Sequence, residues 1–374
     1  MEATSGALVR RLLDAGALSA EDVVGRGVEV LDRSRAHRLW MVRVADREGL
    51  MVKLAADDEG RERIRREIET YRLGARAPRL ACRLPRVRLS DPEDGLLAIE
   101  LLEPSETLHD RAMGRGLEPP AFAALGTALA DAHDSLERFA LAGRRAEAPW
   151  VLHVLEPGAA VSPELRVVLD RLAGRDRAAH GLRRAREAWL PETLVHGDLK
   201  LDNCLEVERP GGPATMLVDW ELSGPGDPAW DLGGAVEECL AFAGPPPPAA
   251  PVSHPGSSGP SAGAAASALT RAAPAIDGLL GAYGQAAARP LGPSFPHRVA
   301  LFAGARLLQA ALEYASRDGE KAPTVGRMAA LAVEVLAEPE PLAEAAEQTL
   351  YARRAADERA MAPPPPLLDA EGAR

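Results

Sequence analysis

An eight-residue stretch, HGDLKLDN, gathers side chains that can do chemistry between two apolar segments. It spans residues 196–203 and places Asp198, Lys200 and Asn203 on one loop. Asp198 can accept or orient a hydroxyl proton, Lys200 supplies a positive charge, and the amide oxygen of Asn203 is a hard ligand for a divalent cation. A charged loop tip facing water has a similar composition, so the stretch alone leaves both interpretations open.

Two further polar motifs follow at short spacing. LVDWE, residues 217–221, ends an apolar run on Asp219, and GDPAWDLG, residues 226–233, carries Asp231. A hairpin with its turn at residues 209–213 would return Asp219 to the loop of Asp198 and Asn203. A carboxylate and an amide oxygen are ligands that suit Mg²⁺. A solvated turn is the alternative for each motif, but two motifs in this order are far more specific than one.

The first hundred residues contain the strands and helix that must position these groups. We predict a helix over residues 5–17, a charged helix over 57–73, and strands at 27–31, 38–45, 50–55, 84–89 and 96–102. The turn sequence Asp46–Gly49 joins the second strand to the third. The pattern indicates a small antiparallel sheet with one main helix after its third strand.

Beyond residue 103 the pattern is mostly helical. We predict helices at residues 121–138, 162–190 (as one or two), 275–288, 298–316 and 325–337, and a strand pair at 204–207 and 215–220. The Pro/Gly/Ser/Ala tract at 243–266 is predicted to be a flexible insertion, and residues 362–374 a disordered tail. The expected fold is therefore α+β, with an N-terminal lobe at 1–102 and a helical C-terminal lobe at 103–361.

Lys53 lies in the middle of a predicted strand, where a buried ammonium group needs a partner. In the following helix, Ile64, Ile68 and Tyr71 form an apolar stripe, and Glu67 lies beside them. A lone strand lysine often lies on a solvated face, but an acid on a core-facing stripe needs a cation. We therefore predict that Lys53 pairs with Glu67.

Composition excludes several classes of function. A net charge of −11 and an aromatic content of 4% argue against nucleic-acid and anionic-membrane partners. No run approaches the roughly 18 apolar residues of a membrane span, and no signal peptide is evident. The cysteines Cys82, Cys204 and Cys239 fit neither a disulfide framework nor a zinc site. We expect reduced thiols, a cytoplasmic location and a bacterial origin, whereas the oligomeric state is not predicted.

From about residue 28 to about residue 316, the chain resembles the protein-kinase-like fold. Within that fold it resembles the aminoglycoside phosphotransferases and choline-kinase-like small-molecule kinases, on the strength of HGDLKLDNCL, LVDWE and GDPAWDLG. The resemblance implies an ATP- or GTP-dependent, Mg²⁺-dependent phosphotransferase with two lobes. It implies the following roles: Asp198 as the base, Lys200 at the transferring phosphate, Asn203 and Asp219 as metal ligands, Lys53 and Glu67 as phosphate-positioning residues, and His196 and Asp231 as supports of the loop.

The phosphate-covering segment departs from the protein-kinase pattern. Residues 32–38 contain no glycine, so Ser34 is the remaining candidate for a phosphate contact, although it is also a typical solvated turn residue. The segment from Glu100 to Pro104, which includes Leu102, resembles the hinge whose backbone pairs with adenine. An apolar strand ending near a proline has the same appearance without any nucleotide.

Two features favour a small-molecule hydroxyl acceptor over a protein. Gly197 stands where protein kinases carry an arginine, and Asp231 follows Asp219 by only 12 positions, too few for a peptide platform. The acceptor classes are an aminoglycoside or other antibiotic, a sugar, an amino alcohol or an amino acid; few aromatic residues are available for choline. Asp277, Glu313 and Tyr314 are candidates to face the acceptor, but they fit a helix surface equally well.

Two other functions remain open at this stage. One is a kinase for Ser or Thr of a biosynthetic peptide held by a partner protein. The other is a catalytically inactive, nucleotide-binding scaffold. Inactive relatives usually lose the base, the metal ligands or the strand lysine, and here Asp198, Asn203, Asp219 and Lys53 are all present.

Overall fold

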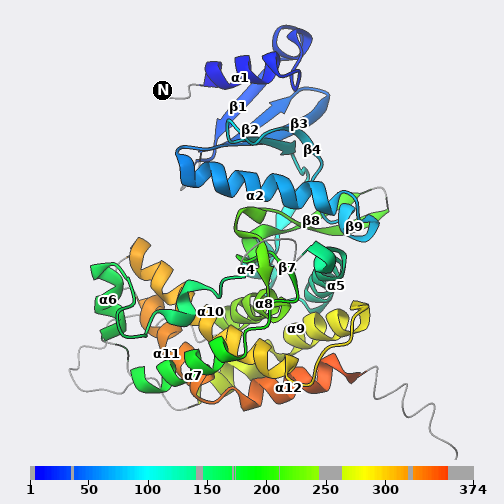
Figure 1. The fold of residues 1–374 in the computed structure, drawn as a ribbon. Coiled ribbons are helices and arrows are strands. Elements are labelled where there is room, and N and C mark those ends of the chain that lie inside the picture. The colour runs from blue at the N-terminus through cyan, green and yellow to red at the C-terminus, as the bar shows by residue number, and fades with distance from the viewer. Residues whose placement is uncertain are drawn as a thin grey trace, which may run out of the picture.

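The computed structural model describes residues 5–34, 38–139, 146–170, 172, 174–209, 211–243, 263–318 and 323–352. A small lobe containing a β-sheet sits on a larger, mostly helical lobe (Figure 1). The α+β two-lobe arrangement predicted from the sequence is therefore confirmed.

The small lobe is built on a five-stranded antiparallel sheet of order β1-β2-β3-β5-β4. Its strands are β1 (Val28–Asp32), β2 (Arg38–Val44), β3 (Arg47–Leu54), β4 (Val87–Asp91) and β5 (Leu96–Glu100). The hairpin between β2 and β3 is tighter than predicted, because Arg47 pairs with Val44 and only residues 45–46 form the turn. Asp46 permits this with a left-handed φ of 56°.

Each face of this sheet is covered by a helix. On one face, α1 (Ser5–Asp14) buries Leu8 and Leu12 against Trp40 and Val52. On the other face, α2 (Asp58–Gly74) is capped at its N-terminus by Asp57. Its apolar residues belong to a hydrophobic core that includes residues of β5 and continues into the helical lobe. A four-residue helix, α3 (Pro78–Ala81), follows. The predicted main helix after the third strand is therefore confirmed, and Figure 1 shows it along the underside of the small lobe.

Short strands between the lobes hold the motif-bearing loops. β8 (Cys204–Arg209) and β9 (Gly212–Leu217) form the predicted hairpin, and β6 (Ser105–Thr107) adds a strand too short to give a sequence signal. β7 (Thr193–Val195) pairs with β10 (Gly224–Gly226). Two turns of 3-10 helix, η4 (Leu201–Asn203) and η5 (Trp220–Leu222), lie at the hairpin ends, so both loops meet at one place.

The helical lobe is organised around α10 (Phe295–Asp318), which packs against α7, α8, α11 and α12. The other helices are α4 (Leu108–Arg115), α5 (Pro119–Leu136), α6 (Pro163–Asp170), α7 (Arg175–Glu187), α8 (Pro228–Ala243), α9 (Ala264–Ala286), α11 (Pro323–Ala337) and α12 (Glu340–Leu350). Two 3-10 turns, η2 (Glu137–Phe139) and η3 (Trp150–His153), also follow α5 in the chain. A π-type turn, η1 (Asp22–Arg26), precedes β1 in the small lobe. The predicted segment 162–190 is thus two helices, whereas α4 and α12 were not predicted.

Two predictions concern segments that the structure describes only in part. The tract at 243–266 was predicted to be flexible, but Ala243 ends α8 and residues 264–266 begin α9, because alanine is a strong helix former. Residues 244–262 and the tail at 362–374 lie outside the described residues. α9 also starts earlier than predicted, since it continues through Pro274.

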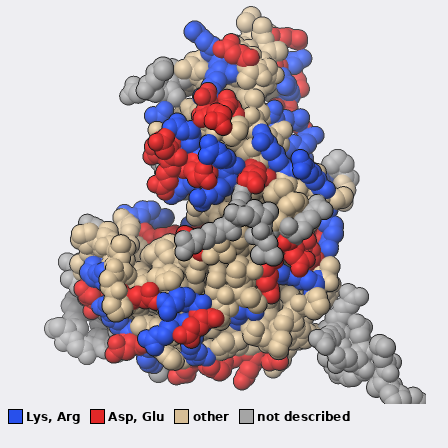
Figure 2. All heavy atoms as spheres, in the orientation of Figure 1, with Lys and Arg blue, Asp and Glu red and all other residues tan. Residues whose placement is uncertain are grey.

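Among the described helices, none is long and apolar enough to cross a membrane. Figure 2 shows lysine and arginine interspersed with aspartate and glutamate over the visible face of the small lobe. The visible face of the helical lobe has a larger share of uncharged surface.

Candidate active site

Three charged residues from three elements meet between the lobes. The ammonium nitrogen of Lys53, on β3, lies 2.6 Å from a carboxylate oxygen of Glu67, on α2, and it also bonds Asp219, just after β9. The hydroxyl of Tyr71 donates to the other oxygen of Glu67 at 2.9 Å. The predicted Lys53–Glu67 pair is confirmed, and we call Lys53, Glu67 and Asp219 the nucleotide cluster.

Burial and charge oppose each other within this cluster. Burial disfavours the charged form of Lys53, but Glu67 and Asp219 outweigh burial and raise the pKa of its ammonium group. Burial likewise favours a neutral Asp219, but Lys53 outweighs it and lowers the pKa of that carboxyl. Asp219 also has a φ of 69°, an uncommon conformation for a residue other than glycine. Within the cluster, Lys53 and Asp219 are favoured in their charged forms, whereas burial, only partly offset by Lys53, raises the pKa of Glu67.

The loop from His196 to Lys200 links β7 to η4 and brings its polar groups to the same place. The side-chain amide of Asn203 donates to the carbonyl oxygen of Asp198 at 3.1 Å, and its backbone carbonyl accepts from Val218 at 3.0 Å. Asn203 therefore lies beside the residue that precedes Asp219. Gly197 is required here: its φ is 84°, and a Cβ would lie 2.4 Å from the carbonyl oxygen of Leu222.

Asp231, in the first turn of α8, fixes the loop through its backbone. Its two carboxylate oxygens accept from the N–H groups of His196 at 2.7 Å and Gly197 at 3.0 Å. His133, from α5, bonds the same carboxylate at 3.0 Å. Burial opposes the charge of Asp231, but the hydrogen bond from His133 and the neighbouring charges outweigh it and lower its pKa. This geometry matches the supporting role expected for Asp231.

His196 makes structural contacts of its own. Its Nε2 lies 2.8 Å from the carbonyl oxygen of Val218, and its ring packs on Trp220 with 4.7 Å between centroids. Both contacts join the loop to the segment that carries Asp219, between β9 and η5. The position fits a brace for the loop.

A second group of charges surrounds Asp198 on the side of the helical lobe. Lys200 lies 3.2 Å from one oxygen of Asp198 and 3.1 Å from Glu313 on α10, and Arg306, also on α10, lies 3.5 Å from the other oxygen of Asp198. Burial favours a neutral Asp198, but Arg306 and Lys200 outweigh it and lower its pKa. We call the following set the acceptor cluster: Asp198, Lys200, Glu237, Glu238, Arg306 and Glu313.

Glu237 is the unusual member of the acceptor cluster. It is only 3% exposed, and its carboxylate has no hydrogen-bond partner among the described residues. Burial, with the charge of Glu238 next to it, raises the pKa of Glu237 well above the ordinary range. A carboxylate in such surroundings is costly in free energy, which makes Glu237 a candidate for contact with a ligand.

Sequence reasoning did not identify Glu237, Glu238 or Arg306. The available signal was a charged residue inside an otherwise apolar helix: VEECLAFA for the two acids and LFAGARLLQA for the arginine. Of the three acceptor-facing candidates, Glu313 joins the cluster, and Tyr314 is near enough to Glu238 for that charge to help burial raise its pKa. Asp277 instead bonds Thr349 at 3.0 Å.

The predicted phosphate-loop and hinge residues already have partners. The N–H of Ser34 donates to Asp32 at 2.8 Å and its hydroxyl accepts from Leu39 at 3.0 Å, so Ser34 stabilises its own turn; residues 35–37 lie outside the described chain. The N–H of Glu100 donates to the carbonyl of Arg86, and its carboxylate pairs with Arg86 and Arg209. Leu102 packs with Val207 and Met216.

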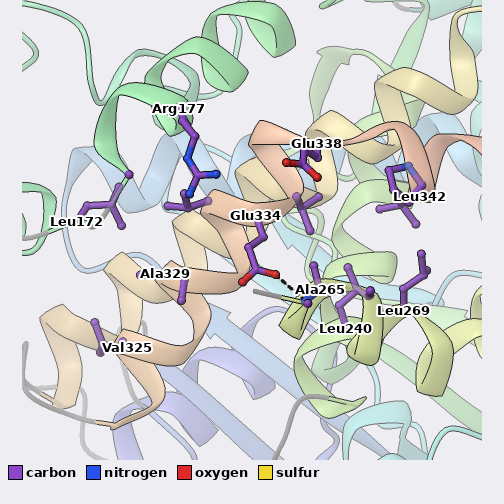
Figure 3. Close-up of a pocket in the computed structure, with 18 of the residues that line it drawn as sticks. Leu172, Arg177, Leu240, Ala265, Leu269, Val325, Ala329, Glu334, Glu338 and Leu342 are labelled. Atoms are coloured by element: carbon purple, nitrogen blue, oxygen red, sulfur yellow. Dashed lines mark hydrogen bonds between the residues drawn. The ribbon is translucent and has the colours of Figure 1, made fainter. Parts of the chain in front are cut away.

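A cavity of about 610 Å³ lies elsewhere in the helical lobe (Figure 3). Its walls come from α7, α9, α11 and neighbouring segments, and include Leu172, Arg177, Leu240, Leu269, Val333 and Glu334. Glu334 accepts a hydrogen bond from the N–H of Ala265 at 2.8 Å. No member of either charged cluster is among the lining residues, so this cavity is separate from the candidate active site.

The two lobes, with a Lys–Glu–Asp cluster at their junction, define a protein-kinase-like fold. The profile of the Phosphotransferase enzyme family matches residues 28–265, and the chain belongs to that family. No curated protein sequence matches the chain significantly.

Solved structures show the same fold at low sequence identity. A choline/ethanolamine kinase family protein from Mesorhizobium loti is 19% identical with a TM-score of 0.51, covering 92% of this chain and 99% of that one. A fructosamine-3-kinase described from Thermobifida fusca is 20% identical, with a TM-score of 0.50 and coverage of 88% and 100%. The GDP complex of aminoglycoside 2'-phosphotransferase-IIIa is 14% identical, with a TM-score of 0.51 and coverage of 90% and 100%.

Proposed function

We propose that the protein transfers the γ-phosphate of ATP or GTP, with Mg²⁺, to a hydroxyl group of a small molecule. The observation that carries this proposal is the ion pair of Lys53 with both Glu67 and Asp219, beside the loop of Asp198 and Asn203. Phosphoryl transfer depends mainly on positioning and on charge stabilisation, and these residues provide both. The nucleotide would lie between the lobes at 1–102 and 103–361.

Asn203 and Asp219 fit the requirements of an Mg²⁺ site. The amide nitrogen of Asn203 is engaged by the carbonyl of Asp198, which leaves its amide oxygen for a cation. The side chain of Asp219 is 38% exposed and ionised. Both offer hard oxygen ligands, and Mg²⁺, when bound there, would neutralise charge on the phosphates.

Each remaining residue has a role that its contacts support. Asp198 would orient the acceptor hydroxyl and receive its proton, and Lys53, held by Glu67, would bind the phosphates. Lys200 would supply positive charge at the transferring phosphate, from a position fixed by Glu313. The N–H of Leu102 is the hinge group we assign to adenine, since those of Glu100 and Leu101 donate to Arg86 and Gly49; Ser34 would act only by shaping its turn.

The acceptor cluster favours an acceptor that carries a positively charged amine. Four carboxylates, of Asp198, Glu237, Glu238 and Glu313, face two cations, Lys200 and Arg306. The pKa values of Glu237 and Glu238 are raised, so the two cations do not offset burial there; an ammonium group would supply further positive charge and give Glu237 a partner. This favours an aminoglycoside, an amino alcohol or an amino acid over a neutral sugar.

The first experiment is thermal unfolding with ATP or GTP at millimolar concentration, with and without Mg²⁺. A nucleotide that binds only the folded protein raises the Tm by mass action. We expect a Mg²⁺-dependent rise for the wild type, a much smaller one for Asp219→Ala, and the full rise for Asp202→Ala, an exposed carboxylate in the same region. If neither nucleotide raises the Tm of the wild type, the proposal is wrong and an inactive scaffold becomes the better interpretation.

A second experiment tests the acceptor class. Hydroxyl compounds with and without an amine are screened by nucleotide turnover, with aminoglycosides first. We expect turnover with amine-bearing acceptors, and a raised KM for them in Glu237→Gln with the nucleotide KM unchanged. Turnover restricted to uncharged sugars would refute the assignment of the amine.

A further inference from the structure

Arg306 is a buried cation that reaches the loop of Asp198 from a distant part of the chain. It lies in the middle of α10 and is 3% exposed. One of its guanidinium nitrogens donates to the carbonyl oxygen of Leu199 at 3.0 Å, and the other lies 3.5 Å from Asp198. Arg306 therefore contacts Asp198 and the residue that follows it.

Helix α8 leaves a slot for this side chain. A Cβ at Gly234 would lie 2.9 Å from the carbonyl oxygen of Leu199 and 3.3 Å from the Nε of Arg306. Glycine weakens a helix interior, but here it leaves room for the contact between the arginine and the loop. The ring of Trp230, one turn earlier, lies 5.5 Å from the guanidinium carbon. Two helices thus shape the surroundings of Arg306.

The same guanidinium group contacts Asp198 and acts electrostatically on two acids of the acceptor cluster, Glu237 and Glu238. Burial raises the pKa of Glu237 and of Glu238, and the charge of Arg306 opposes that rise without cancelling it. Lys200 also pairs with Asp198, but its side chain is 33% exposed and therefore more strongly screened by water. Arg306 is the better shielded of the two cations.

We propose that Arg306 is a positioning residue that fixes the orientation of Asp198 towards the acceptor hydroxyl and keeps the neighbouring acids from displacing it. It does so by holding the carbonyl of Leu199 and by placing its charge beside one oxygen of Asp198. This inference rests on the proposed function for the role of Asp198 as the base. Arg306 itself touches neither the nucleotide nor the reacting hydroxyl.

The kinetic test compares Arg306→Gln and Arg306→Lys with a matched control, Arg298→Gln. Arg298 is also 3% exposed, lies on α10 and packs on an aromatic ring, but its ion pair is with Asp227. The probe is the hydrolysis of MgATP or MgGTP, with water as the acceptor. We expect kcat to fall about tenfold or more in Arg306→Gln with the nucleotide KM within twofold, and partial recovery of kcat in Arg306→Lys.

Arg298→Gln is expected to lower the Tm while leaving kcat within about threefold of the wild type. An unchanged kcat in Arg306→Gln would overturn the inference. A similar loss of kcat in both Gln variants would also overturn it, because the effect would then be one of general destabilisation.

A second test needs no turnover and so separates this inference from the proposed function. A double-mutant cycle in thermal unfolding combines Arg306→Gln with Asp198→Asn, and the control cycle combines Arg298→Gln with Asp198→Asn. We expect Arg306→Gln to lower the Tm by several degrees, and by clearly less when Asp198 is already neutral. The control cycle should be additive.

Additive effects in the Arg306 cycle would overturn the inference even if the protein proves to be an active kinase. If Arg306→Gln does not fold, Arg306→Lys takes its place in the same cycle, with the same expected sign. If nucleotides fail to raise the Tm but the cycle shows coupling, the structural link stands and the proposed function fails.

Discussion

The nucleotide cluster and the acceptor cluster balance their charges differently. In the nucleotide cluster, Lys53 bonds both Glu67 and Asp219, and Tyr71 satisfies the second oxygen of Glu67. In the acceptor cluster the acids outnumber the cations, and Glu237 has no hydrogen-bond partner among the described residues. The first cluster is satisfied by protein groups, whereas in the second the acids are in excess. This contrast is why we propose the first for nucleotide binding and the second for contact with the acceptor.

The largest expected effect separates catalysis from nucleotide binding. In Asp198→Asn the general base is removed, so we expect kcat to fall by about 10³-fold. The rise in Tm on adding the Mg²⁺ nucleotide should remain, because Asp198 lies outside the nucleotide cluster. Turnover assays and thermal unfolding of the same preparation give both quantities; wild-type turnover by this variant would contradict the role of Asp198.

The next effect is expected at Asp231, the anchor of the loop that carries Asp198. In Asp231→Asn an amide replaces a buried carboxylate that accepts two backbone N–H bonds and one from His133, and we expect the free energy of unfolding to fall by about 3 kcal/mol. Denaturant unfolding measures it, and Asp202→Ala serves as the exposed control. A loss below about 1 kcal/mol would mean that the loop does not depend on this anchor.

Lowering the pH tests independently whether the ionised carboxylate of Asp231 stabilises the folded protein. Its pKa is lower in the folded protein than in the unfolded chain, so its stabilisation is complete above the ordinary carboxyl pKa. That stabilisation is lost as the pH falls through the folded value. The stability difference between the wild type and Asp231→Asn should therefore shrink below about pH 4.

Matched glutamine substitutions in the two clusters should have effects of opposite sign. Glu67→Gln removes half of the negative charge that holds Lys53 and should cost about 2 kcal/mol. Glu237→Gln removes a buried carboxylate without a partner and should stabilise the protein by about 1 kcal/mol. Denaturant unfolding at pH 7 tests both, and destabilisation by Glu237→Gln would contradict the excess of negative charge.

The benefit of Glu237→Gln should depend on pH. The pKa of Glu237 is raised in the folded protein, so its ionisation costs stability as the pH rises from the ordinary glutamate pKa through the folded value. The variant lacks this ionisation. Its stability relative to the wild type should therefore grow with rising pH and vanish below about pH 4.

The smallest effect is expected for an exposed ion pair on the surface of α2, which serves as the reference for the other substitutions. Glu62 pairs with Arg65 and Arg66, but its side chain is 47% exposed. We expect Glu62→Ala to change the free energy of unfolding by less than about 0.5 kcal/mol, because exposed ion pairs contribute little. A larger loss would mean that the effects in the two clusters cannot be assigned to burial.

Local patterns were sufficient to predict most of the nucleotide cluster. The strand-like pattern of apolar residues predicted β3 and its lysine. The helical period of the apolar residues placed Glu67 on the buried face of α2, and the order of the motifs placed Asp219 after a hairpin. These residues depend on local geometry plus one pairing across the lobes. Their positions therefore follow from the period of the apolar residues and from the spacing of the motifs along the chain.

The acceptor cluster could not be predicted in the same way. Arg306 meets Asp198 across 108 residues, through the packing of α10 on α8, and no local period encodes that contact. α9 was likewise shortened in the prediction, because Pro274 is typical of a helix start, whereas burial of Ala268 and Ala272 favours a longer helix. In both cases tertiary packing decided the outcome.

Helix α8 carries the anchor of the catalytic loop at Asp231 and the unpartnered acid at Glu237, six residues further on. Under the proposed function, substitutions in its second half would change the lining of the acceptor site and leave the first turn, and with it the loop, untouched. A descendant of this chain would then acquire a new acceptor by drift at a few positions of one helix. That evolutionary route is short, because the two proposed roles belong to separate turns of the same element.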